Sequence, residues 1–148
     1  MAKCRGFNNF KERGEWVELQ FMARALRQKF RVSKPWGDSS AYDVGVEYDR
    51  VFLRVQVKST DYRIGNGYLC AFKPNQHSRR PYTTRKIDFF AAYVIPEDAW
   101  YLLPAAVVLQ TKSLSLMLCP VKQKRRGSFQ YEVYREAWKL LRKTTLSS

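Results

Sequence analysis

The fold of this chain is decided by Leu53-Arg-Val-Gln-Val-Lys-Ser-Thr60, read with Tyr42-Asp43-Val44, which begins eleven residues earlier. Side chains of a strand alternate between its two faces. The apolar side chains of the later stretch therefore point to one face, and Gln56 and Lys58 point to the other. If the two stretches pair as a hairpin, Asp43, Gln56 and Lys58 can meet on one polar edge.

Size and charge narrow the class of protein. With 148 residues, the chain is long enough for one domain, residues 1–148, with an ordinary core. The 27 Lys and Arg against 13 Asp and Glu give a net charge of +14. This excess favours nucleic acid as the partner, because each neutralised phosphate releases counterions. A membrane surface or an acidic protein is the alternative partner that charge alone allows.

Other patterns exclude several classes. No apolar run approaches the roughly 18 residues of a membrane span, and no apolar stretch follows the N-terminus as in a secretory signal. Three widely spaced cysteines and a single histidine argue against a disulfide framework and the usual zinc spacings. We therefore expect a cytoplasmic protein in a reducing compartment, with no membrane partner.

The order of predicted elements indicates one mixed α/β domain. A helix is predicted over residues 9–29, because Asn9 can cap it and Glu12 stands at the capping-box position. The sequence Gly65-Asn66-Gly67 predicts a hairpin turn. Residues 105–119 are ambiguous between helix and strand, and residues 131–142 predict a C-terminal helix. Strands are predicted over residues 31–35, 42–47, 51–59, 68–72, 87–95 and 99–103.

Several of these elements together resemble the PD-(D/E)XK nucleases. The similarity is closest to intron-encoded homing endonucleases of that superfamily and weaker to archaeal Holliday-junction resolvases. The similarity covers about residues 13–60 and is weaker over residues 87–93 and 100–104. The resemblance implies a restriction-endonuclease-like mixed sheet of about five strands flanked by helices. The residues that carry it are Gly14-x-x-x-Glu18, Pro35, Tyr42-Asp43-Val44 and Gln56-x-Lys58.

The same resemblance implies a role for each polar residue. Asp43 matches the metal-ligating aspartate, and Gln56 stands at the (D/E) position, where the homing enzymes also place glutamine. Lys58 matches the lysine that orients or activates the attacking water. Because glutamine offers one oxygen and no charge, the site loses a negative ligand for Mg²⁺, which Glu18 could partly replace. The main-chain carbonyl of Val57 can supply a further oxygen. We expect Mg²⁺ as the cofactor, with Mn²⁺ able to substitute.

Helical periodicity and the family motif disagree about which glutamate completes the site. The apolar side chains expected to face the core are Leu19, Met22, Leu26 and Phe30. Spacing places Glu15 nearer this stripe than Glu18, and only the Gly-x-x-x-Glu match selects Glu18. Both glutamates stay open as candidates at this point.

Two basic segments are candidate DNA contacts. The first lies in the polar loop over residues 74–86, where arginine and lysine side chains suit phosphates and Tyr82 suits stacking. The second is the charge run over residues 122–126. A solvated loop is the ordinary alternative for each. The basic residues concerned are Arg79, Arg80, Arg85 and Lys86 in the first segment, and Lys122, Lys124, Arg125 and Arg126 in the second.

The expected function is Mg²⁺-dependent hydrolysis of DNA phosphodiester bonds, similar to that of homing endonucleases. Because one site cuts one strand, cutting a duplex suggests a homodimer or homotetramer. Two alternatives remain: a structure-selective resolvase that uses the same residues on branched DNA, and a non-catalytic nucleic-acid-binding protein on a nuclease scaffold.

Overall fold

Helix α1 (Phe10–Arg27) opens the computed structural model, which describes residues 6–74, 82–120 and 130–143. The predicted cap is confirmed, because the side-chain oxygen of Asn9 accepts a hydrogen bond from the Glu12 N–H at 2.8 Å. The Glu12 carboxylate in turn accepts from the N–H of Asn8, one residue earlier than a capping box would place it.

The predicted apolar stripe of α1 is right for two of its four residues. Phe30, just after the helix, is buried and Met22 packs against the core, whereas Leu19 and Leu26 are 61% and 55% exposed. The buried apolar residues of the helix itself are Val17, Phe21 and Ala25. These three follow a spacing of four residues and pack against the sheet. The helix carries apolar side chains on two sides, and the pattern alone favoured the larger ones.

The main sheet has five strands in the order β1-β2-β3-β6-β7. The β3–β6 pair is parallel, and the other neighbours are antiparallel. The predicted hairpin of β2 and β3 is confirmed, and its two-residue turn has positive φ at both Asp49 and Arg50, as a turn of this twist requires. The strands are β1 (Arg31–Ser33), β2 (Val44–Tyr48), β3 (Val51–Thr60), β6 (Phe89–Val94) and β7 (Ala99–Pro104).

A second, smaller antiparallel sheet has the order β4-β5-β8. Its first two strands flank the predicted Gly65-Asn66 turn. The ambiguous segment over 105–119 contains both a helix and a strand. The elements concerned are β4 (Arg63–Ile64), β5 (Gly67–Ala71), α2 (Ala105–Leu109) and β8 (Ser115–Leu118); a short 3₁₀ helix, η1 (Ile95–Glu97), links β6 to β7.

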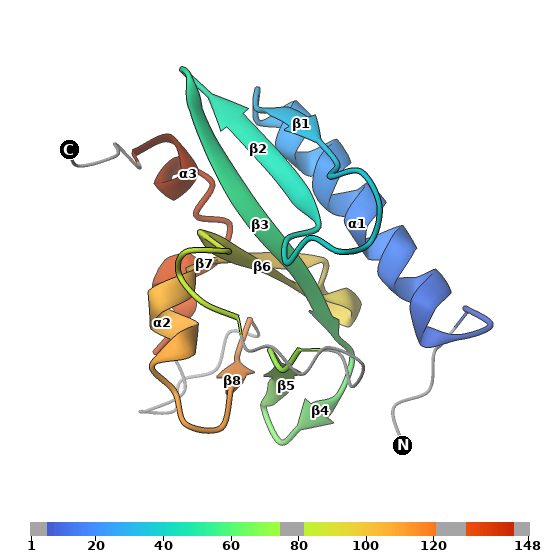
Figure 1. Cartoon of the computed structure of the whole chain (residues 1–148). Coiled ribbons are helices and arrows are strands. Elements are labelled where there is room, and N and C mark those ends of the chain that lie inside the picture. Colours follow the sequence, from blue (N-terminus) through green and yellow to red (C-terminus); the bar gives the residue numbers. More distant parts are fainter. Residues whose placement is uncertain (1–5, 75–81, 121–129, 144–148) are drawn as a thin grey trace.

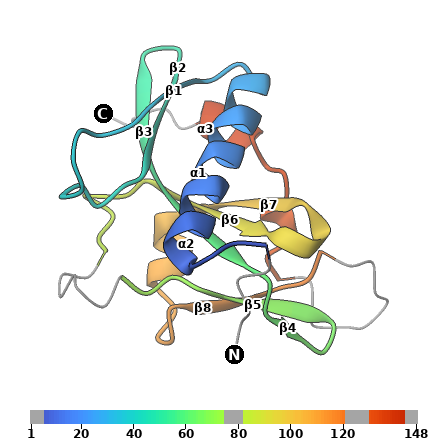
Figure 2. The same ribbon diagram turned by 90° about the vertical axis from the view of Figure 1, so that its right-hand side faces the viewer.

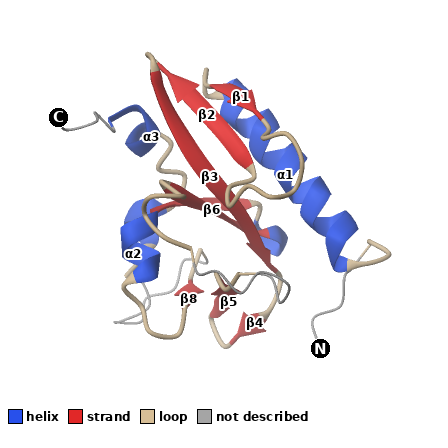
Figure 3. Cartoon of the chain, in the orientation of Figure 1, coloured by secondary structure: helices blue, strands red, loops and turns tan. Residues whose placement is uncertain are grey.

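The main sheet is covered by α1 on one face, and its strands β6 and β7 are covered on the other face as well (Figure 1). One core lies between the sheet and α1, and the other lies between the sheet, α2 and the second sheet. Figure 2 shows α1 in front of the main sheet with the second sheet beyond one end, and Figure 3 shows the helices outside the strands. All six residues of β6 are buried, which explains why its sequence does not alternate.

The predicted continuous C-terminal helix over 131–142 is wrong. The chain forms a 3₁₀ turn, η2 (Glu132–Tyr134), and a separate helix, α3 (Lys139–Lys143). Between them the Glu136 N–H donates to the Trp100 carbonyl at 2.7 Å, and the Glu136 carboxylate accepts from the Trp100 N–H at 3.0 Å. The segment breaks its helix because it pairs with the otherwise open edge of β7.

Within the described ranges, no helix is long and apolar enough to cross a membrane.

Candidate active site

Asp43 lies immediately before β2 and is tied to the middle of β3. Its N–H donates to the Val55 carbonyl at 2.9 Å, and its Oδ2 accepts from the Val57 N–H at 2.9 Å. The carboxylate therefore takes the place of a main-chain acceptor where the regular pairing of β2 has ended. Because the N–H and C=O of one strand residue point to the same side, the Val57 carbonyl faces this open side as well.

Gln56 and Lys58 lie on the face of β3 opposite the α1 core. Val57, between them, belongs to the core under α1, whereas Gln56 and Lys58 are partnered in β6 by Phe90 and Ala92 of the other core. The hairpin register ends at Val44 and Val55, and Asp43 bonds to Val55 and Val57, the two residues that flank Gln56. Asp43 therefore lies beside the part of β3 that carries Gln56, which is only 9% exposed.

Glu18, not Glu15, is the glutamate that approaches this edge. Glu18 forms an ion pair with Lys34, which follows β1, and its charge acts on Asp43. Glu15 is exposed to solvent. The geometry agrees with the motif because the buried side of α1 runs through Val17 and Phe21, which rotates Glu18 toward the sheet.

Burial dominates the electrostatics of Asp43. It raises the pKa of this carboxyl from 3.8 to about 6, and the charge of Glu18 adds to the rise. The Val57 N–H, Lys58 and Lys34 oppose the shift without cancelling it. The carboxylate is therefore short of compensating positive charge in the protein alone.

Lys58 lies among aromatic and main-chain groups. Its Nζ donates to the Lys73 carbonyl at 3.2 Å and stands 5.4 Å from the centre of the Tyr82 ring. That ring packs edge-to-face on Phe90, with centroids 5.5 Å apart. Burial lowers the pKa of Lys58, and the charge of Asp43 partly restores it. Burial, with the nearby Asp43 charge, also raises the pKa of Tyr82 to about 12.

The donors at this edge fit a hard divalent cation. Such ions prefer carboxylate, amide and carbonyl oxygens, and the undercompensated charge of Asp43 would be relieved by one. No cluster of three His, Cys, Asp or Glu side chains occurs in the described part of the chain. A cation here would therefore draw on Asp43 and Glu18 together with neutral oxygens of Gln56 and Val57.

The predicted DNA contacts are only partly within the structure. Arg79, Arg80 and the run Lys122, Lys124, Arg125 and Arg126 lie outside the described residues. Arg85 and Lys86 are exposed. The carbonyl of Arg85 accepts a hydrogen bond from the Arg54 guanidinium, which also pairs with Asp88. Tyr82 packs beside Lys58 and Phe90, so its ring is part of the candidate site.

Two basic residues near the site were missed from the sequence. Lys34 pairs with Glu18, and no pattern around Pro35 indicated that role. Arg13 is only 5% exposed on α1, one turn before Val17. Its place in the four-residue spacing of the buried side would have revealed it, had that side been identified.

Comparisons with known proteins bear on the family and the fold of the chain. A family model described as PD-(D/E)XK endonuclease matches residues 8–141. The solved structure of a bacterial homing endonuclease, I-Ssp6803I, matches with a TM-score of 0.75 and 26% sequence identity. The match covers 95% of this chain and 92% of that chain. Comparison with curated proteins gave no match.

Proposed function

Because the chain belongs to the PD-(D/E)XK endonuclease family, we propose that it hydrolyses phosphodiester bonds of DNA at the edge formed by Asp43, Gln56, Lys58 and Glu18. Mg²⁺ is the proposed cofactor, and Mn²⁺ a substitute. The observation that carries the proposal is the meeting of these groups: Asp43 is bonded to the strand that bears Gln56 and Lys58, and the charges of Glu18 and Lys58 both act on it. The similarity to a bacterial homing endonuclease supports DNA as the substrate.

The side chains and the main-chain carbonyl at this edge have two proposed roles: some bind the cation, and the lysine takes part in proton transfer. Asp43, Glu18, Gln56 and the Val57 carbonyl would hold the cation, which when bound supplies positive charge at the phosphoryl oxygens and makes water more acidic. Lys58 presents its amine beside these ligands. Since burial lowers the pKa of Lys58, the amine can release a proton more readily than an exposed lysine and can share in proton transfer.

The proposed reaction adds water across one P–O bond. The oxygen of water bonds to phosphorus while the bond from phosphorus to the 3′ oxygen breaks, and the departing oxygen gains a proton. The products carry a 5′-phosphate and a 3′-hydroxyl. Because one such site cuts one strand, we infer that a duplex is cut by a homodimer or homotetramer, which sedimentation of the protein at working concentration would test.

The test removes the two central groups one at a time. Asp43→Ala and Lys58→Ala should each slow cleavage of DNA in Mg²⁺ by on the order of 100-fold or more, the lower range for loss of a positioned acid or base. Gel assays should use linear duplex and four-way junction substrates, because cleavage of junctions alone would favour the resolvase alternative. Thermal melting confirms that each variant is folded.

Matched controls remove the same charges elsewhere. Asp38 and Lys112 are exposed, so Asp38→Ala and Lys112→Ala should leave the cleavage rate unchanged. Equal cleavage rates for wild type and Asp43→Ala at matched purity would overturn the catalytic assignment of Asp43. DNA binding without cleavage by the wild type would leave a DNA-binding protein on this scaffold.

A further inference from the structure

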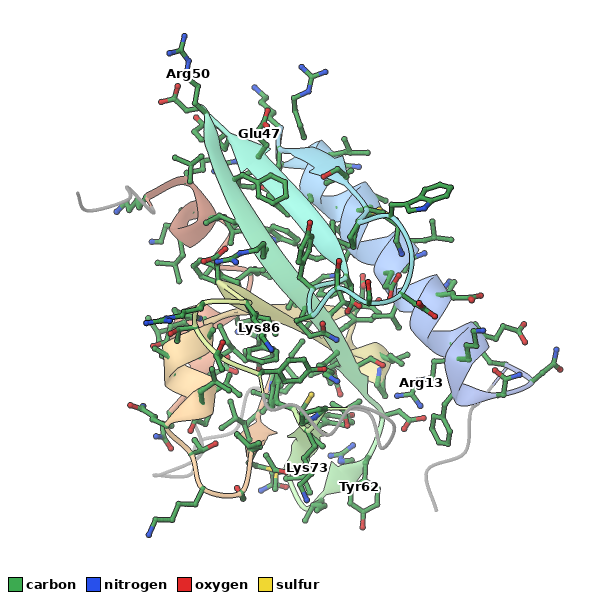
Figure 4. All side chains as sticks on the ribbon, viewed as in Figure 1. Arg13, Glu47, Arg50, Tyr62, Lys73 and Lys86 are labelled. Carbon is green, nitrogen blue, oxygen red and sulfur yellow. The ribbon has the colours of Figure 1, made fainter. Side chains whose placement is uncertain are left out.

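A cavity outside the candidate active site opens between the first turns of α1, the end of β3 and β5. It has a volume of about 220 Å³, which is room for several water molecules at about 30 Å³ each. Exposed aromatic rings of Phe10 and Tyr62 lie at its wall. Figure 4 shows Arg13 beside the end of β3, with Tyr62 close by toward the second sheet. The other lining residues are Gly14, Ser59, Thr60, Asp61, Leu69 and Ala71.

Arg13 is a buried cation with unused hydrogen-bond donors in this cavity. Its side chain is 7% exposed. The Nη2 atom donates to the Ser59 hydroxyl at 3.5 Å, the limit for such a bond. The Nη1 atom lies 3.4 Å from Asp61 Oδ1 and has no hydrogen-bond partner among the described residues. A guanidinium has five donors, and the described contacts leave Nη1 without an acceptor, so the group is short of acceptors. Leaving a buried donor unsatisfied is unfavourable.

Gly14 keeps space open beside Arg13. A glycine inside a helix is destabilising relative to alanine, and this one does not have the positive φ that would require it. A Cβ atom added at Gly14 would meet nothing within 4 Å. Backbone geometry and packing therefore do not explain the glycine, and a long side chain at this position would enter the cavity.

The geometry points to a phosphate-binding site: the cavity takes a backbone phosphate of the DNA, held by Arg13 and the Ser59 hydroxyl, next to the phosphate that is cut. This inference rests on the proposed function. A guanidinium fork matches phosphate oxygens in geometry and charge. Ser59 directly follows Lys58 near the end of β3, and its side chain points to the opposite face, toward Arg13 of α1. Phosphates advance about 3.4 Å along the duplex axis per nucleotide, so neighbouring phosphates of one strand that passes around the end of β3 can reach both places.

Asp61 sets the strength of the site. Its carboxylate stands near Arg13 without a hydrogen bond to Nη1, so it holds the guanidinium and leaves that donor for an anion. The same negative charge repels a phosphate. Removing it should therefore strengthen DNA binding, whereas a purely structural ion pair would predict lower stability and unchanged binding.

The experiment measures DNA binding by fluorescence anisotropy against salt concentration, in EDTA so that no cleavage occurs. Gly14→Met should fill the cavity, weaken binding about tenfold and flatten the slope of log affinity against log salt by roughly one unit. Because methionine favours helices, the variant should melt no lower than wild type. Asp61→Asn should tighten binding severalfold.

Two controls isolate the cavity. Gly14→Ala adds only a methyl group and should keep most of the affinity. Arg27→Gln removes a positive charge from the other end of α1, fourteen residues and about 21 Å away, and should leave the salt slope unchanged. Wild-type affinity and slope in both Gly14→Met and Asp61→Asn would overturn the site.

The result is separable from the test of the proposed function. Mg²⁺-dependent cleavage that Asp43→Ala abolishes would stand even if Gly14→Met bound DNA normally, whereas a wild-type protein that bound no DNA would overturn both. A titration with inorganic phosphate, followed by phosphorus NMR, separates the sources of the ligand. Phosphate binding that Gly14→Met abolishes, with DNA affinity unchanged, would replace the DNA assignment by a free-phosphate site.

Discussion

Asp43 serves the fold and the proposed chemistry with the two oxygens of one carboxylate. Its carboxylate accepts the Val57 N–H, which a main-chain carbonyl of β2 would otherwise accept. A side chain in this position is fixed by the sheet, and its second oxygen stays available on the open side. This position is also buried, and burial disfavours the charged carboxylate, so the pKa of Asp43 is raised to about 6.

This shift predicts a pH-dependent stability of the metal-free protein. The folded pKa of about 6 lies above the ordinary 3.8, so between these values the folded state binds more protons than the unfolded state. Stability should therefore fall as pH rises from about 4 to 6 and stay lower above that range. A difference of about 2 pKa units corresponds to roughly 3 kcal/mol at most.

Denaturant unfolding in EDTA from pH 4 to pH 8 checks this for wild type and Asp43→Asn. Asparagine can still accept the Val57 N–H but carries no charge. The variant should gain stability over wild type as pH rises through about 6, and a difference that does not change with pH would show that Asp43 titrates normally.

Gln56 tests whether a neutral amide belongs to the cation site. Gln56→Glu adds a carboxylate near Asp43 at nearly constant size, so Mg²⁺ should bind more tightly, since hard cations gain from a further negative oxygen. Gln56→Leu removes the oxygen and should weaken both Mg²⁺ binding and cleavage. Cleavage by Gln56→Glu could still fall if Lys58 became locked in an ion pair.

Isothermal titration calorimetry with Mg²⁺ compares the three proteins directly. Indistinguishable binding curves would place Gln56 outside the reach of the cation, and the site would then consist of Asp43, Glu18 and a main-chain carbonyl.

Among the elements, the segment from Tyr82 to β6 joins the basic loop to the site. The Asp88 carboxylate accepts the Arg54 N–H at 2.8 Å, and Asp88 donates its own N–H to the Arg54 carbonyl at 2.9 Å. The N–H groups of Lys86 and Ile87 both donate to the Thr83 carbonyl at 3.0 Å. These bonds fix the C-terminal part of the loop against β3 while Lys86 stays exposed.

From this anchoring we expect the loop to bind DNA phosphates. A variant with alanine at Arg79, Arg80, Arg85 and Lys86 should bind DNA more weakly, and its salt slope should flatten by about one unit for each phosphate that the variant no longer neutralises. Anisotropy titrations at several salt concentrations provide the measurement, with Lys112→Ala as a single-charge control. An unchanged slope would exclude this loop and direct attention to residues 122–126.

At the scale of the whole molecule, local patterns predicted more than long-range ones. The β2–β3 hairpin and its polar edge followed from alternation within some 20 residues, because a strand shows its two faces in its own sequence. The buried side of α1 could not be identified from the sequence, because the helix has apolar residues on two sides and only packing against the sheet distinguishes them. The break before α3 depends on the open edge of β7, which no local pattern reveals.

The same distinction applies to the site. Asp43, Gln56 and Lys58 could be named because they share one hairpin and a family motif. The position of Tyr82 against Lys58 depends on a loop returning from a distant part of the chain. Arg13 was hidden because a charged residue on a buried helix face contradicts the usual pattern.

The single parallel pair in the main sheet has a consequence for the order in which the protein folds. The Asp43–Val57 hydrogen bond closes over fourteen residues, whereas the Arg54–Asp88 bond that ties β3 to β6 spans 34. Closing the longer segment costs more chain entropy, and hairpins form within about 1–10 μs. The part of the site that the β2–β3 hairpin carries, with Asp43 bonded to Val57, can therefore assemble while the chain is still collapsing. The aromatic surroundings of Lys58 arrive only when the pairing between distant segments is complete.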